Sequence, residues 1–167
     1  MTRRVEVSVV TPVFNGEKYL GDAIDSVLSQ DVDLEMLVVD DGSEDGSRPL
    51  AAARAAEDAR LRPLENVRRS GPAGARNTGI EAARGRYIAF LDCDDLWYPG
   101  KLVAQIDRLR EPGVALTYSS FDLVGADGVP LGVTRHAPER VDYATLLRSN
   151  VRSEERRVGK ECFLLCR

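Results

Sequence analysis

The stretch Tyr87–Trp97 constrains the fold of this chain more than any other part of the sequence. It begins with an apolar run, Tyr87–Leu91, and then places Asp92, Asp94 and Asp95 within four positions. A continuous apolar run of this length is typical of a strand buried on both faces of a sheet. Charged carboxylates are costly to bury, so we expect these three at the carboxyl end of the strand, beside solvent or a cleft.

The three aspartates have two interpretations. Carboxylates that lie close together repel one another unless a cation lies between them. Mg²⁺ and Mn²⁺ prefer oxygen ligands and often bridge to phosphate, which favours a metal–phosphate site. The alternative is an acidic turn in which Asp95 caps the helix that follows Pro99. These residues alone leave both interpretations open.

Apolar runs and helical periods alternate along the chain. We expect strands at residues 5–10, 34–39, 61–64, 87–91 and 114–118, and helices at 17–30, from Asp45 or Ser47 to 59, at 75–83 and at 101–109. A hairpin over 122–133 and a short helix over 142–148 are expected to follow. This alternation predicts an α/β fold, a mostly parallel sheet with helices on both faces.

Strand order 3-2-1-4 is the commonest arrangement of such a sheet. Ligands bind outside the carboxyl ends of the strands, where the order reverses. This order would bring Pro12–Asn15, Asp40–Asp41 and Asp92–Asp95 side by side. We expect Pro12 to end the first strand because it lacks a backbone donor, and Asn15 to cap the following helix.

Several classes of function are disfavoured. The segment Thr11–Gly16 has one glycine, so it forms neither a dinucleotide fingerprint nor a P-loop. His136 is the only histidine and lies in a polar stretch, which argues against a catalytic triad. The net charge of −4 argues against nucleic acid as a partner. A nucleotide held through a metal on carboxylates fits what is left.

Localisation and cysteine chemistry follow from what the sequence lacks. No apolar run approaches the roughly 18 residues of a membrane span, and the first residues lead straight into a strand-like run instead of a signal peptide. We therefore expect a cytoplasmic protein. The three cysteines form neither a disulfide framework nor a zinc motif, and Cys93 is expected to face the core.

Four segments resemble glycosyltransferase family 2, the inverting sugar-nucleotide transferases with the Rossmann-like GT-A fold. Their order and spacing match over about residues 5–150. The segments are Val9–Asn15, Val38–Ser43, Gly71–Gly79 and Phe90–Trp97.

The resemblance implies a nucleotide-sugar site made of Pro12, Phe14, Asn15, Asp40, Asp41, Arg76 and Asp92. Pro12 and Phe14 would line the base pocket, and Asp40 would accept a hydrogen bond from the base. Arg76 would lie near the base or the diphosphate, and Asp92 would contact the ribose. The simpler alternatives are that Phe14 packs as a hydrophobic staple on the first helix and that Arg76 is a surface arginine.

The resemblance also implies a metal cofactor, Mg²⁺ or Mn²⁺, with Asp94 as its ligand and Asp92 as a second candidate. Asp41 would orient its loop, and Asp95 would cap a helix or order the waters of the metal. Trp97 is expected to pack in the core.

The implied reaction is a single in-line displacement at the anomeric carbon. The expected donor is a UDP-sugar, and dTDP- and GDP-sugars are the alternatives. The acceptor is a glycan or lipid-linked hydroxyl in cell-envelope or exopolysaccharide synthesis. The full-length protein is expected in the cytoplasm or peripherally at the inner face of the membrane. Two other functions stay open: a non-catalytic sugar-nucleotide-binding module, and a nucleotidyltransferase, which would need a glycine-rich basic loop after the first strand.

The last residues, 152–167, have neither a helical nor a strand period and resemble the translation of a sequencing adapter. We expect residues 1–151 to be the nucleotide-sugar-binding part of a GT-A domain and 152–167 to be non-native and disordered. On this interpretation the chain is an incomplete, inactive fragment whose general base lies beyond its end. A basic arm for anionic lipid is the alternative for 152–167.

Overall fold

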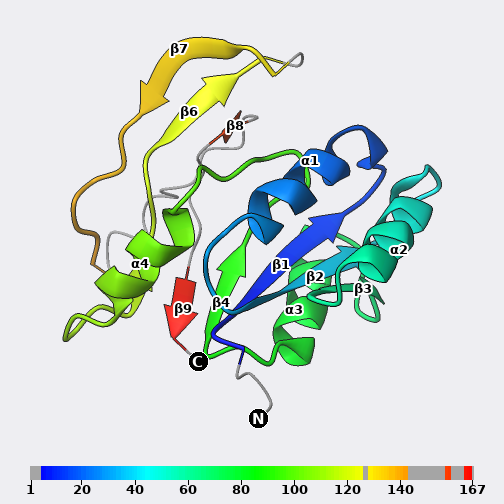
Figure 1. Ribbon diagram of the computed structural model, residues 1–167, viewed down its shortest axis with the longest axis horizontal. Coiled ribbons are helices and arrows are strands. Elements are labelled where there is room, and N and C mark those ends of the chain that lie inside the picture. The colour runs from blue at the N-terminus through cyan, green and yellow to red at the C-terminus, as the bar shows by residue number, and fades with distance from the viewer. Residues whose placement is uncertain (1–4, 126–127, 143–156, 159–163, 167) are drawn as a thin grey trace.

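The computed structural model describes residues 5–125, 128–142, 157–158 and 164–166. Its main sheet (Figure 1) has the strand order β3-β2-β1-β4-β9-β5, which confirms the predicted order 3-2-1-4. The first four strands run parallel, and β9 runs antiparallel between β4 and β5. The strands are β1 (Val7–Val13), β2 (Leu34–Asp40), β3 (Leu61–Glu65), β4 (Tyr87–Phe90), β5 (Leu116–Thr117) and β9 (Leu164–Cys166).

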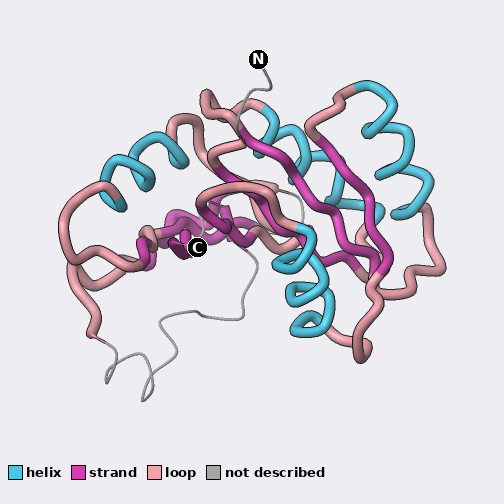
Figure 2. Tube along the Cα trace, turned by 90° about the horizontal axis from the view of Figure 1, so that it is seen from below, coloured by secondary structure: helices cyan, strands magenta, loops and turns pink. Residues whose placement is uncertain are grey.

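Helices cover both faces of the sheet (Figure 2). On one face, Val7 and Val9 of β1 belong to a core cluster with Leu20 and Ile24 of α1 and Leu102 of α4. On the other face, a second cluster joins alternate residues of the same strands to the helix α3. The helices are α1 (Glu17–Leu28), α2 (Ser47–Glu57), α3 (Pro72–Ala82) and α4 (Lys101–Leu109).

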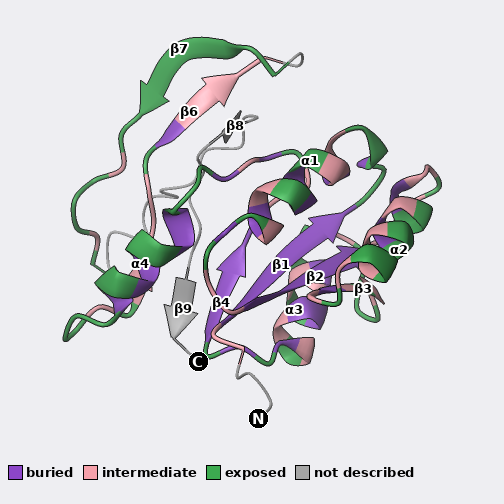
Figure 3. Ribbon diagram, in the orientation of Figure 1, coloured by how far each residue is buried: buried purple, intermediate pink, exposed green. Residues whose placement is uncertain are grey.

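The burial of the strands explains their apolar sequences. All residues of β1, β2 and β4 are buried (Figure 3), as expected for strands covered on both faces. In contrast, every residue of β7 (Pro130–Arg135) is exposed. This strand pairs with β6 (Phe121–Val124), which confirms the predicted hairpin. The predicted helix at 142–148 lies outside the described residues from 143 onward.

Pro12 does not end the first strand, contrary to the prediction. β1 continues to Val13, and Pro12 pairs with Val39 of β2. The Val10 carbonyl accepts from the Leu91 N–H at 3.2 Å, and the pairing of β1 with β4 goes no further than Val10. Backbone groups two residues apart point to the same side of a strand, so the missing donor of Pro12 faces the side where β4 has already ended. The ladder therefore loses nothing.

For residues 152–167 the structure describes two short segments, and the disorder expected for this stretch stays a prediction. The structure places Arg157–Val158 in a short strand, β8, beside β6, and Leu164–Cys166 in β9. β9 pairs with the edge of β4 that faces away from β1. The non-native origin of residues 152–167 stays a prediction.

Candidate active site

The carboxyl ends of β1, β2 and β4 meet at one edge of the sheet, because β1 lies between the other two and all three are parallel. Three loops therefore converge there. They carry Phe14–Gly16, Asp41–Gly46 and Leu91–Gly100.

Phe14 and Asn15 follow β1 directly. Phe14 is 60% exposed, so it does not pack against α1 as a hydrophobic staple and its ring is open to a ligand. Asn15 does not cap α1, contrary to the prediction: the N-cap is Gly16, which has no side chain to accept a cap bond. The Asn15 Oδ1 instead accepts from the Glu44 N–H at 2.9 Å. Tertiary contact with the neighbouring loop has replaced the local cap.

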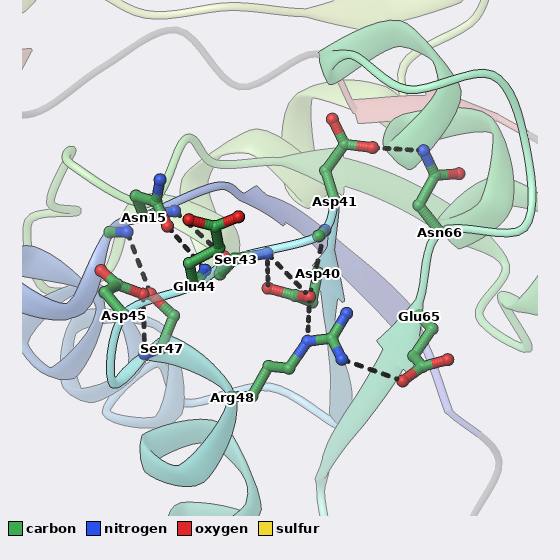
Figure 4. Close-up of polar contacts among 12 residues, drawn as sticks. Asn15, Asp40, Asp41, Ser43, Glu44, Asp45, Ser47, Arg48, Glu65 and Asn66 are labelled. Atoms are coloured by element: carbon green, nitrogen blue, oxygen red, sulfur yellow. Dashed lines mark hydrogen bonds and ion pairs between the residues drawn. The ribbon is translucent and has the colours of Figure 1, made fainter.

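Asp40 ends β2 and is only 6% exposed. Its carboxylate accepts hydrogen bonds from the N–H groups of Gly42 and Ser43 and from Arg48 Nε at 2.5 Å (Figure 4). Burial opposes the ionisation of this carboxyl, but the hydrogen bonds from Ser43 and Arg48 outweigh it and hold the pKa of Asp40 below its ordinary value. Asp40 is thus a charged group that organises its own loop.

Asp41 joins its loop to the segment before α3. Its carboxylate accepts from Asn66 Nδ2 at 2.5 Å, from the Gly71 N–H at 2.6 Å and from Ser70 Oγ at 3.2 Å. Asn66 in turn accepts from Thr78 Oγ1 at 2.9 Å. These contacts are the ones that a loop-orienting role would need.

Arg76 lies on α3 and points toward the acidic loop. Its Nη2 donates to Asp92 Oδ1 at 2.6 Å, and the two side chains are 22% and 29% exposed. Arg76 Nε is buried and has no hydrogen-bond partner among the described residues. Arg76 is therefore not an unpartnered surface arginine.

The remaining acids of the loop differ in exposure. Asp94 is exposed, whereas Asp95 is 1% exposed. Asp95 is not the N-cap residue of α4, which is Gly100. Burial, followed by the charges of Asp94 and Asp92, raises the pKa of the Cys93 thiol to about 12.

The carboxylates of the acidic loop fit a divalent metal that takes only one or two ligands from the protein. Within the described ranges, no three His, Cys, Asp or Glu side chains are grouped so that they could hold an ion by themselves. Mg²⁺ usually binds through one or two carboxylates and completes its shell with waters and substrate phosphates. The exposed carboxylate of Asp94, with Asp92 two positions earlier, matches that donor set.

Trp97 is 4% exposed and belongs to the core, as expected. Sequence reasoning missed two partners of the acidic residues, Arg48 and Asn66. Asn66 directly follows β3. The rule that ligands bind at the carboxyl ends of the strands, which selected Asp40, would therefore also have selected Asn66. Arg48 carries no such signal, because its proximity to Asp40 depends on how α2 packs.

Two pockets lie at opposite ends of the sheet. A pocket of about 160 Å³ at the carboxyl edge is lined by Asp40 and Arg48, with Val13, Val38 and Ala51 among its apolar walls. A larger one, of about 750 Å³, lies at the amino ends of the strands and includes none of the residues predicted for the site. We place the site at the carboxyl edge, because that edge carries the converging acidic loops.

Comparison with known proteins gives a consistent assignment. The family model described as "Glycosyl transferase family 2" matches residues 8–166. A Bacillus subtilis protein named as a teichuronic acid biosynthesis glycosyltransferase, TuaG, is 39% identical over 146 residues, which cover 87% of this chain and 58% of that protein. The Escherichia coli protein WfgD is 35% identical over 86% of this chain and 55% of its own length. Its name describes a UDP-Glc:α-D-GlcNAc-diphosphoundecaprenol β-1,3-glucosyltransferase.

A solved structure shows the same fold. The mannosyltransferase PcManGT from Pyrobaculum calidifontis, in complex with GDP-Man and Mn²⁺, superposes with a TM-score of 0.64 and 29% identity, covering 71% of this chain and 36% of that one. The chain thus spans little more than half the length of the two curated relatives and about a third of this structure.

Proposed function

Because the chain belongs to glycosyltransferase family 2, we propose that it binds a nucleoside-diphosphate sugar at the carboxyl edge of its sheet, as the donor-binding part of an inverting, metal-dependent transferase. The observation that supports this most is the convergence of complementary groups there. An exposed aromatic ring (Phe14), a guanidinium (Arg76) and an exposed carboxylate (Asp94) lie at the ends of elements that share one sheet edge.

Each group suits one part of the donor. The exposed ring of Phe14 offers an apolar face for the base. Arg76 suits the diphosphate, because a guanidinium binds phosphate oxygens in a bidentate manner. Asp92, which accepts a hydrogen bond from Arg76, is proposed to contact the ribose hydroxyls or to serve as a second metal ligand. Mg²⁺ or Mn²⁺ on Asp94 would neutralise charge that develops on the leaving diphosphate.

The transfer itself is a single displacement. An acceptor hydroxyl attacks the anomeric carbon, the bond to the diphosphate breaks, and the configuration inverts. A general base must take the acceptor proton. Asp122 is not proposed for this role, because its two carboxylate oxygens accept hydrogen bonds from Tyr98 at 2.8 Å and from Thr134 at 2.5 Å.

Substrate classes follow from the relatives as part of the proposal. A UDP-sugar is proposed as donor, since WfgD is named for UDP-Glc, while the GDP-Man complex of PcManGT keeps a GDP-sugar as the alternative. A glycan or lipid-linked hydroxyl of the cell envelope is proposed as acceptor, in line with the names of TuaG and WfgD. In the described part of the chain, none of the helices combines the length and apolarity that a membrane span needs.

Thermal unfolding with UDP and Mn²⁺ tests the proposal. The ligand pair should raise the melting temperature of the wild-type chain, because a ligand that binds only the folded state stabilises it. Asp94→Ala should abolish that shift. The matched control is Asp22→Ala, which removes an exposed carboxylate from α1 and should leave the shift intact. Equal shifts in wild type and Asp94→Ala would refute the metal assignment, and no shift in either would refute nucleotide binding.

A further inference from the structure

The loops that follow β1 and β2 hold each other through reciprocal hydrogen bonds, several of them visible in Figure 4. Three consecutive backbone N–H groups at the start of α1 donate to three side chains of the β2–α2 loop. The pairs are Asn15 with Ser43 Oγ at 3.0 Å, Gly16 with Ser47 Oγ at 3.0 Å, and Glu17 with Asp45 Oδ2 at 2.9 Å.

Two bonds run in the other direction. The Glu44 N–H donates to Asn15 Oδ1, and the Gly46 N–H donates to Glu17 Oε2, both at 2.9 Å. We call the residues 15–17 and 43–47, joined by these bonds, the interloop clasp. Each loop thus supplies both donors and acceptors, and neither can move alone without leaving polar groups unpaired.

The clasp replaces the usual caps of two helices. The N-cap residues of α1 and α2 are Gly16 and Gly46, and neither helix has a cap bond from its own N-cap side chain. Asp45 serves both helix starts, because its Oδ2 accepts from Glu17 and its Oδ1 accepts from the Ser47 N–H at 3.0 Å. A carboxylate is favourable there, since both helix dipoles point their positive ends toward it.

The backbone of the clasp is constrained. Asn15 has a φ of 50°, and no other non-glycine residue among those described has a positive φ. Such a conformation is costly for most side chains and persists only where contacts hold it. At Gly46 a Cβ would lie 2.3 Å from Glu17 Oε1, so a larger residue there would displace the Glu17 carboxylate from its place in the clasp.

The clasp connects the two residues proposed to hold the base. Phe14 directly precedes it on one loop. On the other loop, the Ser43 N–H donates to the Asp40 carboxylate at 3.2 Å, while Ser43 Oγ accepts from Asn15. Ser43 therefore ties the Asp40 carboxylate to the residue next to Phe14.

We infer that the interloop clasp sets the distance between the Phe14 ring and Asp40, and that Asp45 is its main positioning residue for recognition of the nucleotide base. Asp45 acts through the loops and touches no ligand. This inference rests on the proposed function, because it presumes that the base binds between these loops. Its consequence is specific: loosening the clasp should impair binding of the base and spare binding of the diphosphate.

The test compares two probes by calorimetry on the full chain, UDP with Mn²⁺ and inorganic pyrophosphate with Mn²⁺. Asp45→Ala should weaken UDP binding about tenfold, the equivalent of losing a helix cap. Asp45→Asn, which keeps one acceptor oxygen, should weaken it less. Pyrophosphate affinity should stay at the wild-type value in both variants, which a general loss of structure would not produce.

Ser29→Ala is the matched control. It removes one side-chain hydrogen bond, to the Ser26 carbonyl at 3.1 Å, at the other end of α1, and both affinities should be unchanged. If circular dichroism shows that Asp45→Ala is unfolded, Ser43→Ala decides: it removes the Oγ that accepts from the Asn15 N–H and keeps the backbone bond to Asp40, and a UDP-selective loss is again expected.

The outcomes separate the two proposals. Unchanged UDP affinity in folded clasp variants, or equal losses for UDP and pyrophosphate, would overturn the inference about the clasp. A wild-type chain that binds pyrophosphate with Mn²⁺ but not UDP would overturn both the base pocket and the clasp. A wild-type chain that binds neither probe would overturn the proposed function itself.

Discussion

Arg76 and Asp92 face each other across the candidate site, with 2.6 Å between Nη2 and Oδ1. Both side chains are partly exposed, so solvent screens the pair and its contribution to stability is small. The pair is better suited to binding a ligand than to stabilising the fold. Arg76 Nε is buried and has no hydrogen-bond partner among the described residues, so it is available to a ligand. At the scale of the residue, we therefore propose Arg76 as the cation that binds the diphosphate.

Replacing Arg76 tests this role. Arg76→Ala should weaken the binding of UDP with Mn²⁺ by about 10- to 100-fold, because it removes a charge-assisted contact worth about 1.5–3 kcal/mol. Arg76→Lys should recover part of the loss, since it restores the charge but not the planar fork. Calorimetric titration measures both. Arg86→Ala, at an exposed arginine just before β4, is the control, and equal affinities for wild type and Arg76→Ala would contradict the assignment.

The packing of α3 on β1 illustrates the scale of the element. A Cβ at Gly79 would lie 2.3 Å from Cγ1 of Val10, so the helix approaches the strand as closely as only glycine permits. The same helix carries Arg76, and its start is tied to Asp41 through Gly71. The depth at which α3 sits on the sheet thus determines where Arg76 lies relative to the acidic loop.

Gly79→Ala should therefore be destabilising although alanine favours helices. The added methyl group forces α3 away from β1, and overpacking of this kind costs about 1–3 kcal/mol. Urea denaturation measures the change in the free energy of unfolding. Gly21→Ala on α1 is the matched control, since nothing lies within 4 Å of its Cβ position; it should be neutral or stabilising. A Gly79→Ala variant as stable as Gly21→Ala would show that the two elements can separate freely.

At the scale of the whole molecule, a buried polar network joins the amino ends of the strands. Glu35 is 4% exposed and accepts from Ser8 Oγ and the Arg84 N–H at 2.7 Å each, while Arg62 Nη1 donates to its other oxygen at 2.7 Å. Burial raises the pKa of Glu35, but the hydrogen bonds from Ser8 and Arg62 outweigh it, and the net pKa is lowered. The network links β1, β2, β3 and the turn before β4, at the end of the sheet opposite the site.

This network predicts an acid-sensitive fold. A carboxyl whose folded pKa lies below its unfolded value stabilises the protein above the unfolded pKa, and that stability is lost as the pH falls through the folded pKa. Glu35→Gln should lower the free energy of unfolding at neutral pH by about 1–3 kcal/mol. It should also flatten the fall in stability below about pH 4.5. Urea titrations across this range measure both effects, and parallel pH profiles for wild type and variant would contradict the prediction.

The alternation of apolar strands and amphipathic helices determined the class of fold, since buried parallel strands must be apolar throughout and their crossovers must be right-handed. The acids after Val39 and Leu91 were expected at the sheet edge because burial of a carboxylate is costly. They follow the strands there as predicted, but Asp40 and Asp95 are nevertheless buried, with 6% and 1% exposure. The ends of the helices were predicted less accurately from the sequence. Helix α3 begins at Pro72 and not near Ala75, because proline fits the first turn, where no donor is needed.

Only the tertiary structure decided which residues form hydrogen bonds with the polar side chains at the carboxyl edge of the sheet. Asp40 pairs with Arg48, Asp41 with Asn66, and Asn15 with the loop at Glu44 instead of its own helix. The last two contacts join residues 25 and 29 positions apart, and such contacts depend on how the elements pack against the sheet. Periodicity records which side of an element is buried, whereas hydrogen bonds between loops depend on distances that are set only when the elements have assembled. The sequence by itself therefore determined that an acidic edge exists, and the packed molecule decided how that edge is built.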